Sequence, residues 1–340
     1  MTISTAGLNT LLEKYFPDIE QVTISKGASG YNNTTRFIQY KDEKFVLRIY
    51  ETHNDVAKVM LEHEILEKLK TKDLPFNIPL PILSKLGKTY HHLEEDTNKL
   101  ACLFSYIKGD NPLFHNKQEI YSFGVQTGFL LNGLSGIKVS RPFVYKPYYE
   151  IENTHPQCTV ENIVEWCTNP PAEFKDYSTH LQIIRDKLLQ FIEYVPMLRK
   201  LPHQLIHGDL NQSNILVNSS GKISAILDFE FVTLDIRAME VAVCLSEIII
   251  KESNKMEVLD KLRLFHEGFT KVSALDENEI NALPVLVQLR RLDVFVHFLG
   301  RHIDGLDHAD VLKEQVINYI TNLKWMDETD EKLLDIWNGK

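Results

Sequence analysis

The stretch that most constrains the fold of this chain is residues 205–230, LIHGDLNQSNILVNSSGKISAILDFE. Within it the apolar runs ILV and ISAIL are joined by the turn NSSG, a pattern typical of a β-hairpin. A hairpin brings its two ends together, so Asp209 and Asn214, before the first strand, are expected to lie beside Asp228, after the second. We therefore expect three polar side chains to share one site.

These three side chains have a chemical use as a set. Asn214 and Asp228 offer oxygen ligands of the kind that Mg²⁺ takes together with water and substrate phosphates. Asp209, five residues before Asn214 in the frame D-L-x-x-x-N, is then left to accept a proton from an incoming hydroxyl. Kinase phosphoryl transfer uses the same arrangement, with one Asp as base and an Asn and a second Asp on the metal.

The two motifs HGDLNQSNIL and ILDFE resemble those of the aminoglycoside phosphotransferase family, which is kinase-like and includes choline, homoserine and methylthioribose kinases. His207, Gly208, Asp209 and Asn214 match the family motif H-G-D-x-x-x-x-N, and Asp228 opens D-F-E where protein kinases have D-F-G. The resemblance implies that Asp209 is the base, that Asn214 and Asp228 bind the metal, and that ATP and Mg²⁺ are the cofactors. A structural hairpin with capping residues is the plainer alternative, because Asp and Asn are common in surface turns.

The first part of the chain has the strand order of a kinase N-terminal lobe. Residues 6–16 predict an amphipathic helix, and strands are expected at IEQVTISKG, TTRFIQY and FVLRIYE. The loop KGASGYNN, with Ser29 and Gly30, follows the first strand and offers backbone amides that can cover phosphates. It matches neither common glycine-rich phosphate motif, so a hairpin turn without chemical meaning is the alternative.

Arg48 lies in FVLRIY, where the resemblance places the residue that positions the phosphates, a lysine in many members of the family. Arginine keeps the charge and can pair bidentately with phosphate. Residues 54–70 predict the next helix, whose glutamate would hold this cation: Glu64, in H-E-x-L-x-x-L, matches best and Glu62 is second. Solvated positions on a strand and on a helix are the alternatives for Arg48 and Glu64.

The apolar strand LACLFSYIKGD resembles the segment that connects the two lobes in this family. The resemblance implies that backbone groups from Phe104 to Tyr106 face the adenine, and Gly109 allows the chain to bend away. We therefore expect an α+β, protein-kinase-like fold of two lobes. An antiparallel sheet with a packed helix is expected over residues 1–105, and a mainly helical lobe over residues 106–340.

The second lobe is expected to contain helices near 117–133, 180–201, 255–271, 276–303 and 309–337. Between the first two, residues 141–175 are aromatic, rich in proline and irregular in pattern, so they are expected either to shape the acceptor pocket or to form a surface loop. This is the part of the chain that resembles the family least.

Two further sets of polar residues follow the D-F-E motif. Asp235 and Glu240 match two acids of the family, and the resemblance implies that the first braces the loop at Asp209; Asp235 is also suited to cap the following helix. Farther on, four residues with helical spacing share one side of a helix. They are Arg290, Asp293, His297 and Arg301. A salt-bridged face is the favoured interpretation of these four, and a wall of the acceptor site is the alternative.

Composition excludes several classes of protein. With 340 residues, 44% of them hydrophobic and 25% charged, the chain is long and apolar enough for two lobes around a buried core. A net charge of −10 argues against nucleic acid or an anionic membrane as the main partner. The four cysteines form no disulfide or zinc pattern, and no secretory signal or membrane-length apolar run is present. We expect a cytoplasmic protein, as a monomer or a homodimer.

The expected function is ATP-dependent phosphorylation of a hydroxyl on a small molecule, such as an aminoglycoside, homoserine or a related metabolite. The sequence distinguishes neither these acceptors nor ATP from GTP. A non-catalytic, nucleotide-binding pseudokinase is the alternative: Arg48 and the plain loop favour it, and the presence of Asp209, Asn214 and Asp228 opposes it. A metal-dependent hydrolase built on Asp209 and Asp228 would lack a histidine cluster with ligand spacing.

Overall fold

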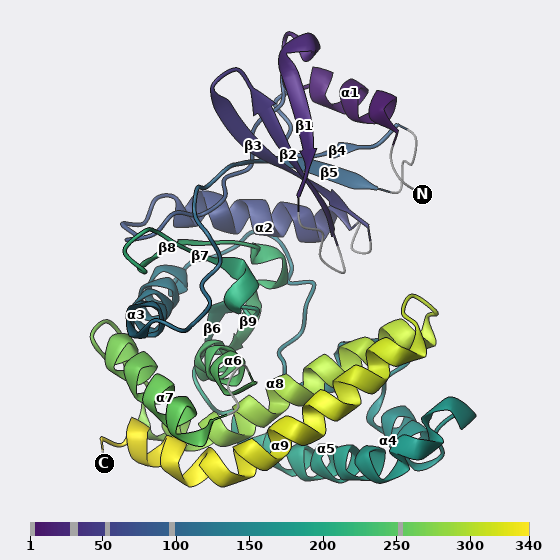
Figure 1. Ribbon diagram of the computed structural model, residues 1–340, viewed down its shortest axis with the longest axis vertical. Helices are drawn as coiled ribbons and strands as arrows, with labels where there is room; N and C mark the ends of the chain where they lie inside the picture. Colours follow the sequence, from purple (N-terminus) through teal and green to yellow (C-terminus); the bar gives the residue numbers. More distant parts are fainter. Residues whose placement is uncertain (1–3, 28–32, 52–54, 95–98, 251–253, 340) are drawn as a thin grey trace.

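The computed structural model describes residues 4–27, 33–51, 55–94, 99–250 and 254–339. Within these ranges a small part built on a β-sheet sits above a larger, mainly helical part (Figure 1). None of the helices in the described ranges combines the length and the apolar character needed to cross a membrane.

The upper part is a five-stranded antiparallel sheet with the strand order β1-β2-β3-β5-β4. Its strands are β1 (Val22–Lys26), β2 (Asn33–Tyr40), β3 (Glu43–Tyr50), β4 (His91–His92) and β5 (Leu100–Ser105). The helices that pack on it are α1 (Thr5–Glu13) and α2 (Val56–Leu69), and the short 3-10 turn η1 (Ile19–Gln21) leads into β1. The two helices and the four strands predicted for this part are confirmed.

The two faces of this sheet belong to two different hydrophobic cores. Along β5, Leu100, Cys102 and Phe104 pack into the large core, which continues through α2 into the helical part. Ala101 and Leu103 point to the other face, where they pack with the apolar side of α1 in a smaller core. This alternation follows from strand geometry, because successive side chains of a strand point to opposite faces.

The lower part is built from seven helices within the described ranges, with two short two-stranded sheets. The helices are α3 (Lys117–Leu134), α4 (Val160–Thr168), α5 (Ser178–Leu198), α6 (Arg237–Ile250), α7 (Lys255–Thr270), α8 (Glu277–Ile303) and α9 (Ala309–Trp337). The sheets pair β6 (His203–Ile206) with β9 (Thr233–Ile236) and β7 (Ile215–Val217) with β8 (Ile223–Ile226). The remaining 3-10 turns are η2 (Ile151–Asn153), η3 (Ala172–Tyr177), η4 (Gln212–Asn214) and η5 (Phe229–Phe231).

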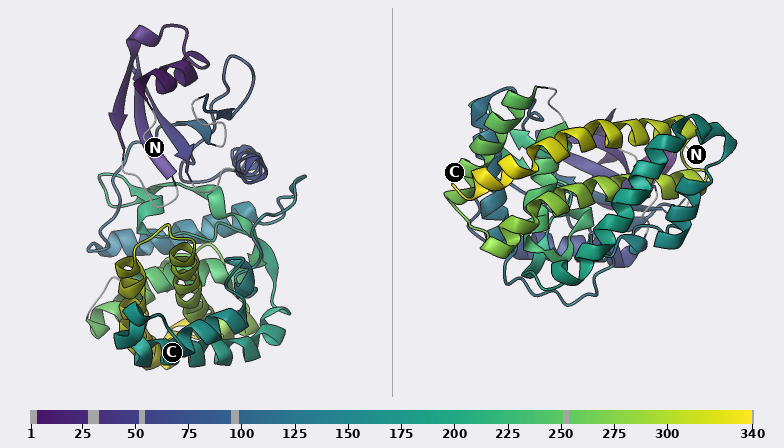
Figure 2. Two further views of the ribbon diagram at one scale, coloured as in Figure 1. Left: turned by 90° about the vertical axis from the view of Figure 1, so that its right-hand side faces the viewer. Right: turned by 90° about the horizontal axis from the view of Figure 1, so that it is seen from below.

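Helix α6 lies at the centre of this part and is buried over most of its length. Helices α8 and α9 run side by side along the base, as the views in Figure 2 show. The capping box of Asp276 and Glu279 fixes the start of α8. The long helix that carries Arg290 is therefore held at both its N-terminus and its side.

Two elements differ from the expectation. Residues 141–175 include helix α4, which begins after Thr159 as N-cap and buries Ile163 and Cys167; proline and aromatic residues around it hid this short pattern. Asp235 does not cap a helix, because it lies in strand β9 opposite Gln204. The hairpin of β7 and β8, by contrast, forms as predicted.

Candidate active site

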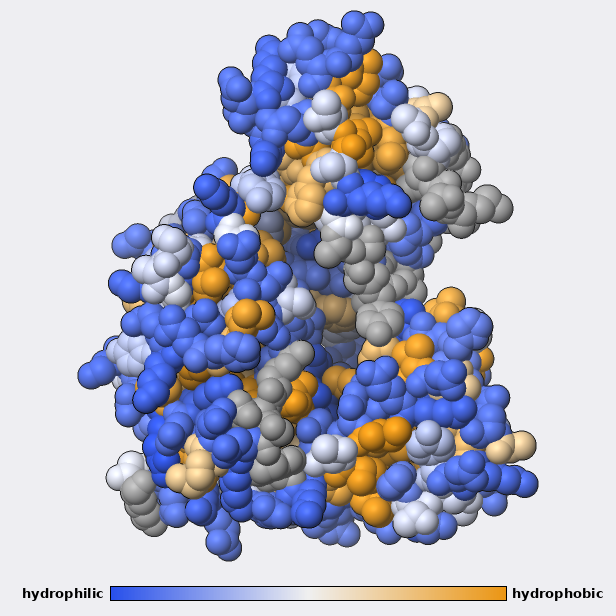
Figure 3. All heavy atoms as spheres, in the orientation of Figure 1, coloured by the Kyte–Doolittle hydropathy of each residue, from blue (hydrophilic) through white to orange (hydrophobic). Residues whose placement is uncertain are grey.

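A cavity of about 830 Å³ opens between the sheet and the helical part. Figure 3 shows the molecule hollowed at this place. One side, which we call the sheet wall, is formed by side chains of β2, β3 and β5. The opposite side, the helix wall, is formed by residues 145–154 and by α8. Between them lies the HGD loop, residues 207–214, together with Asp228 and Glu230.

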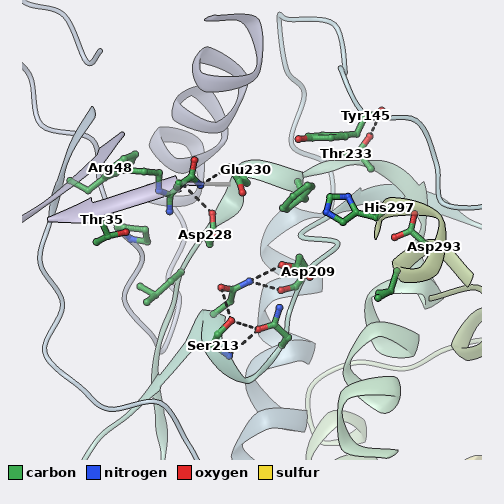
Figure 4. A pocket seen from close by; sticks show the side chains of 18 of the residues that line it. Thr35, Arg48, Tyr145, Asp209, Ser213, Asp228, Glu230, Thr233, Asp293 and His297 are labelled. Carbon is green, nitrogen blue, oxygen red and sulfur yellow. Dashed lines mark hydrogen bonds and ion pairs between the residues drawn. The ribbon is translucent and has the colours of Figure 1, made fainter. Parts of the chain in front are cut away.

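The structure brings Asp209, Asn214 and Asp228 together in this cavity, as the hairpin predicted (Figure 4). The amide nitrogen of Asn214 donates hydrogen bonds to the backbone carbonyl of Asp209 at 2.8 Å and to its carboxylate Oδ2 at 3.0 Å. The backbone N–H of Leu227 donates to the carbonyl of Asn214 at 2.8 Å, which ties the end of β8 to the HGD loop. The loop is therefore shaped from both ends of the hairpin.

His207 and Gly208 give the HGD loop its shape from beneath. His207 is fully buried; its Nε2 lies 2.9 Å from the carbonyl of Leu227, and its Nδ1 accepts the backbone N–H of Asp209 at 3.2 Å. Gly208 adopts a φ of +80°, which glycine takes without the cost of a Cβ. Both backbone N–H groups, of His207 and Gly208, donate to the buried carboxylate of Glu240.

Glu240 therefore braces the HGD loop, the role that the resemblance implied for Asp235, and that expectation is wrong. Asp235 instead accepts the backbone N–H groups of Tyr148 and Ile236, both at 2.6 Å. Burial raises the pKa of Asp235 to about 7. Because the Tyr148 hydroxyl donates to the carbonyl of Gly208 at 2.5 Å, Asp235 supports the loop only through Tyr148.

Asp228 and Arg48 join the sheet wall to the loop. Asp228 has a left-handed backbone, with φ 64° and ψ 69°, a conformation that Asp tolerates better than most residues. Its Oδ1 lies 3.1 Å from Nη1 of Arg48, whose side chain comes from β3. The same guanidinium nitrogen lies 3.0 Å from Oε1 of Glu62, and the other oxygen of Glu62 accepts the hydroxyl of Tyr50 at 3.0 Å.

The expectation that Glu64 pairs with Arg48 is therefore wrong, and the second candidate, Glu62, is the partner. Two residues along an α-helix are rotated by about 200°, so only one of the two glutamates can face the sheet. Glu64 faces away and binds Lys68 at 2.8 Å and the backbone N–H of Ser140 at 2.7 Å. Glu64 thus tethers α2 to the segment that leads into the helix wall.

The charges around Arg48 are buried and mutually compensating. Burial raises the pKa of Glu62, and the positive charge of Arg48 acts in the opposite direction. Burial also raises the pKa of Glu230 to about 8, with the charge of Asp228 as the second cause. Glu230 accepts a hydrogen bond from the side chain of Asn33 at 3.0 Å, so it also bridges the sheet and the loop.

Phe104, in strand β5, and Tyr106, just after the end of that strand, line the cavity. The ring of Tyr106 meets that of Phe37 edge to face, with centroids 5.9 Å apart. The structure gives a reason for glycine at position 109 that differs from the bend that we expected. A Cβ on Gly109 would lie 2.8 Å from Cβ of Leu216 and 3.0 Å from the carbonyl of Val217, so glycine is needed for close packing on β7. Ser29 and Gly30 lie outside the described residues.

The helix wall holds the residues that sequence reasoning missed or ranked second. Arg290 forms an ion pair with Oδ1 of Asp209, donates to the hydroxyl of Tyr148 at 2.8 Å, and lies 3.6 Å from Oδ2 of Asp293. Thr154 donates to Oδ1 of Asp293 at 3.0 Å. Nothing in the sequence singles out Tyr148 or Thr154, because their partners are more than 50 residues away along the chain.

For the four residues with helical spacing on α8, we had considered a salt-bridged face and a wall of the acceptor site, and the structure shows some of each. Arg290, Asp293 and His297 line the cavity, which is the interpretation that we did not favour. Arg301 is part of a salt-bridged face, since its guanidinium binds Asp307 at 2.6 Å and 2.9 Å. Burial lowers the pKa of His297 to about 4, with Arg301 as the second cause, so His297 is neutral near pH 7.

The oxygen donors of the site suit a hard cation. Among the described residues, no group of three or more His, Cys, Asp or Glu side chains is placed to hold a metal ion. The amide nitrogen of Asn214 is committed to Asp209, so its oxygen and the carboxylate of Asp228 are the donors beside the cavity. One amide oxygen and one carboxylate match the way Mg²⁺ binds when substrate phosphates and water complete its shell.

Comparison with known proteins identifies the family of this chain. The model of the phosphotransferase enzyme family matches residues 23–275. A homoserine kinase of Paramagnetospirillum magneticum is 26% identical over 277 residues, covering 80% of this chain and 79% of that protein.

Solved structures show the same fold. An amicoumacin kinase in complex with AMP-PNP, Ca²⁺ and amicoumacin superposes with a TM-score of 0.71 at 16% identity, covering 96% of this chain and 94% of that one. A microcompartment-associated aminopropanol kinase gives 0.72 at 16% identity, covering 97% and 98%. The expected α+β, protein-kinase-like fold is confirmed. The chain belongs to the phosphotransferase enzyme family, whose members phosphorylate small-molecule hydroxyls.

Proposed function

We propose that this kinase transfers the terminal phosphoryl group of ATP to a hydroxyl of a small molecule in a reaction that requires Mg²⁺. The observation that carries this proposal is the meeting of Asp209, Asn214 and Asp228 in one cavity with the Arg48–Glu62 ion pair. These are the parts that kinase phosphoryl transfer requires.

Asp209 is the base in this proposal. Its carboxylate accepts the proton of the acceptor hydroxyl as the oxygen of that hydroxyl forms a bond to the terminal phosphorus and the bond from phosphorus to ADP breaks. Asn214 supports this role, because its amide holds Oδ2 of Asp209 at 3.0 Å. Positioning of the hydroxyl is the main contribution that such an acid makes, since phosphoryl transfer passes through a loose transition state.

Asn214 and Asp228 would hold Mg²⁺, which would neutralise the charge that develops on the phosphate oxygens. Arg48 positions the phosphates in this proposal. A guanidinium has five N–H donors, so donors remain for phosphate while Nη1 pairs with Glu62 and Asp228.

In this proposal the adenine binds against the sheet wall, in the lobe of residues 1–105, and backbone groups from Phe104 to Tyr106 face it. Apolar side chains of β2, β3 and β5 line that end of the cavity, which supports this placement. The backbone amides of Ser29 and Gly30 are proposed to cover the phosphates. Residues 106–340 would then bind the acceptor and carry the base.

The acceptor is proposed to carry an amine besides its hydroxyl, as aminoglycosides and homoserine do. On the helix wall Arg290 is matched by two acids, Asp209 and Asp293, and Glu150 adds a third carboxylate to the lining. The ring of Tyr145 lines the same region. Carboxylates and aromatic faces both attract an ammonium group.

The experiment that tests this function is ADP release by the purified full-length protein with Mg²⁺-ATP and a panel of acceptors: homoserine, choline, methylthioribose, aminopropanol and aminoglycosides. Acceptor-dependent release that is lost in Asp228→Asn would support the proposal and name the acceptor class. ATP binding without release by any acceptor would favour the pseudokinase, and absence of ATP binding would contradict both.

Two further expectations accompany this function. The four cysteines are all unpaired and buried, which supports a reducing, cytoplasmic compartment. A monomer or a homodimer is expected, and light scattering of the purified protein would distinguish them.

A further inference from the structure

Arg290 is the feature of the helix wall that the proposed function leaves unexplained. Its side chain is only 13% exposed and lies between two carboxylates, those of Asp209 and Asp293. Arginine is always charged in proteins, so its burial has to be compensated by ion pairs and hydrogen bonds. The question is what this buried charge does for its neighbours in the cavity.

The carboxylate of Asp209 is held from two sides. Asn214, at the end of the HGD loop, donates to Oδ2 at 3.0 Å. Arg290, on α8 and 81 residues farther along the chain, donates to Oδ1. Because one donor holds each oxygen, rotation of the carboxylate about its last bond would break at least one of these contacts. The direction of the remaining lone pairs is thereby fixed.

Arg290 is itself fixed by the loop that it holds. Its Nη1 donates to the Tyr148 hydroxyl at 2.8 Å, and that hydroxyl donates to the carbonyl of Gly208 at 2.5 Å. Gly208 is bonded to Asp209, so the contacts form a closed ring from Asp209 through Arg290 and Tyr148 back to Gly208. Oδ2 of Asp293 lies 3.6 Å from the same Nη1 and adds a second negative charge beside the guanidinium.

We propose that Arg290 is a positioning residue for Asp209: it holds the carboxylate in the orientation that receives the acceptor hydroxyl, and it does so as one member of a ring with Tyr148 and Gly208. This inference rests on the proposed function, in which Asp209 is the base. Arg290 acts through Asp209, so its loss should slow turnover without weakening the binding of acceptor or nucleotide.

The test uses the full-length protein with Mg²⁺-ATP and L-homoserine. The central variant is Arg290→Gln, with Arg290→Lys and Tyr148→Phe as graded variants. Arg301→Gln is a matched control, because Arg301 is on the same helix, is 11% exposed and also binds an aspartate, but lies outside the cavity lining. Circular dichroism and thermal unfolding of each variant would establish that it is folded.

We expect Arg290→Gln to lower kcat by roughly 10²-fold, the cost of a misplaced reacting group, while the KM values for homoserine and ATP change by less than about three-fold. Arg290→Lys should recover part of kcat, since it restores the charge without the planar fork. Two alanine variants, Arg290→Ala and Arg301→Ala, test the role of the guanidinium group itself. Added guanidinium ion should raise the rate of Arg290→Ala but not that of Arg301→Ala. Tyr148→Phe should lower kcat less than Arg290→Gln does, and Arg301→Gln should leave it within about two-fold.

Three kinetic outcomes would overturn the inference. A rise in the homoserine KM at unchanged kcat would make Arg290 an acceptor-binding residue, and unchanged kinetics would make it purely structural. An increase in kcat would show that Arg290 restrains Asp209 instead of orienting it. If homoserine is not phosphorylated, crystal structures of the wild type and Arg290→Gln replace the kinetics: a carboxylate of Asp209 in the same rotamer in both would overturn the inference.

Failure of the proposed function would look different. Turnover that survives Asp209→Asn would remove Asp209 as the base and the proposed function with it. Turnover that is lost in Asp209→Asn but retained in Arg290→Gln would overturn only the role of Arg290.

Discussion

The two walls of the cavity hold their charges in different ways. Arg48 of the sheet wall pairs with Glu62 of the next helix, α2, so this pairing is local. On the helix wall Arg290, Tyr148 and Thr154 meet partners from distant segments, and the contacts form a connected network. The sheet wall presents a cation held by a strand and a helix, whereas the helix wall holds its charges with irregular chain and α8. In the proposed function, nucleotide binding and orientation of the base would therefore belong to different parts of the molecule.

The strongest test of this comparison is Asp209→Asn, which removes the acid between the two walls and keeps the size and shape of the side chain. Loss of a positioned base costs on the order of 10²–10⁴ in rate, so we expect kcat to fall by that factor. Binding of Mg²⁺-ATP, measured by isothermal titration calorimetry, should stay unchanged because Arg48 and the sheet wall are untouched. Weakened ATP binding would show that the two walls do not act separately.

A matched pair on α2 tests the sheet wall alone. Glu62→Ala leaves Arg48 buried with Asp228 as its ion-pair partner, and breaking a buried ion pair costs roughly 3 kcal/mol of unfolding free energy. The KM for ATP should rise as well. Glu64→Ala, two residues away, removes contacts to Lys68 and Ser140 and should cost about 1 kcal/mol with an unchanged KM for ATP. Urea unfolding and initial rates measure both, and equal effects of the two changes would contradict the assignment of Glu62.

The network behind the helix wall should respond to pH through Asp235. Burial raises its pKa to about 7 in the folded protein, and the facing acids Asp293 and Glu240 act in the same direction. An acid whose folded pKa is raised binds more protons in the folded state, so stability falls as pH rises between the unfolded pKa and the folded one. We expect this group to reduce the unfolding free energy by about 2 kcal/mol between pH 5 and pH 7.

The measurement for this prediction is urea unfolding of the wild type and Asp235→Asn across that pH range. The stability of the variant relative to the wild type should improve as pH rises. Parallel pH profiles for the two proteins would show that Asp235 is ionised throughout the range.

The smallest effect is expected where the sheet wall meets β7. Gly109→Ala would place a Cβ 2.8 Å from Cβ of Leu216, so the hairpin has to move slightly. Overpacking of this kind costs roughly 1 kcal/mol at a site that can partly relax. Thermal unfolding measures the cost, and an unchanged midpoint would mean that β7 recedes freely.

Much of the sheet wall and of the HGD loop could be predicted from the sequence because their residues are close along the chain. A hairpin turn explains why Asn214 and Asp228 meet, and strand alternation explains why Arg48 faces the cavity. The choice between Glu62 and Glu64 failed because motif matching ignores the rotation of a helix between neighbouring residues. The prediction also chose the wrong acid as the brace of the HGD loop. Glu240 contacts the loop from α6, whereas Asp235 lies in strand β9.

The helix wall could not be predicted in the same way. Tyr148 lies in irregular chain without periodicity, and its partner Gly208 is 60 residues away. The spacing of Arg290, Asp293 and His297 did identify one face of α8, but a charged face packed on protein and one exposed to solvent have the same pattern. Only the position of α8 beside the HGD loop separates the two.

The side chains of β5 alternate between the two cores, and this affects how the molecule unfolds. A break at residue 105 would cut through the large core, because the apolar side chains of β5 and α2 share that core with residues of the helical part. We therefore expect that the sheet does not fold alone, although it looks separate in outline (Figure 1). Slow amide hydrogen exchange in β5 should report the opening of the whole chain. Amides of α1, whose buried side chains belong to the smaller core, are expected to exchange through local openings.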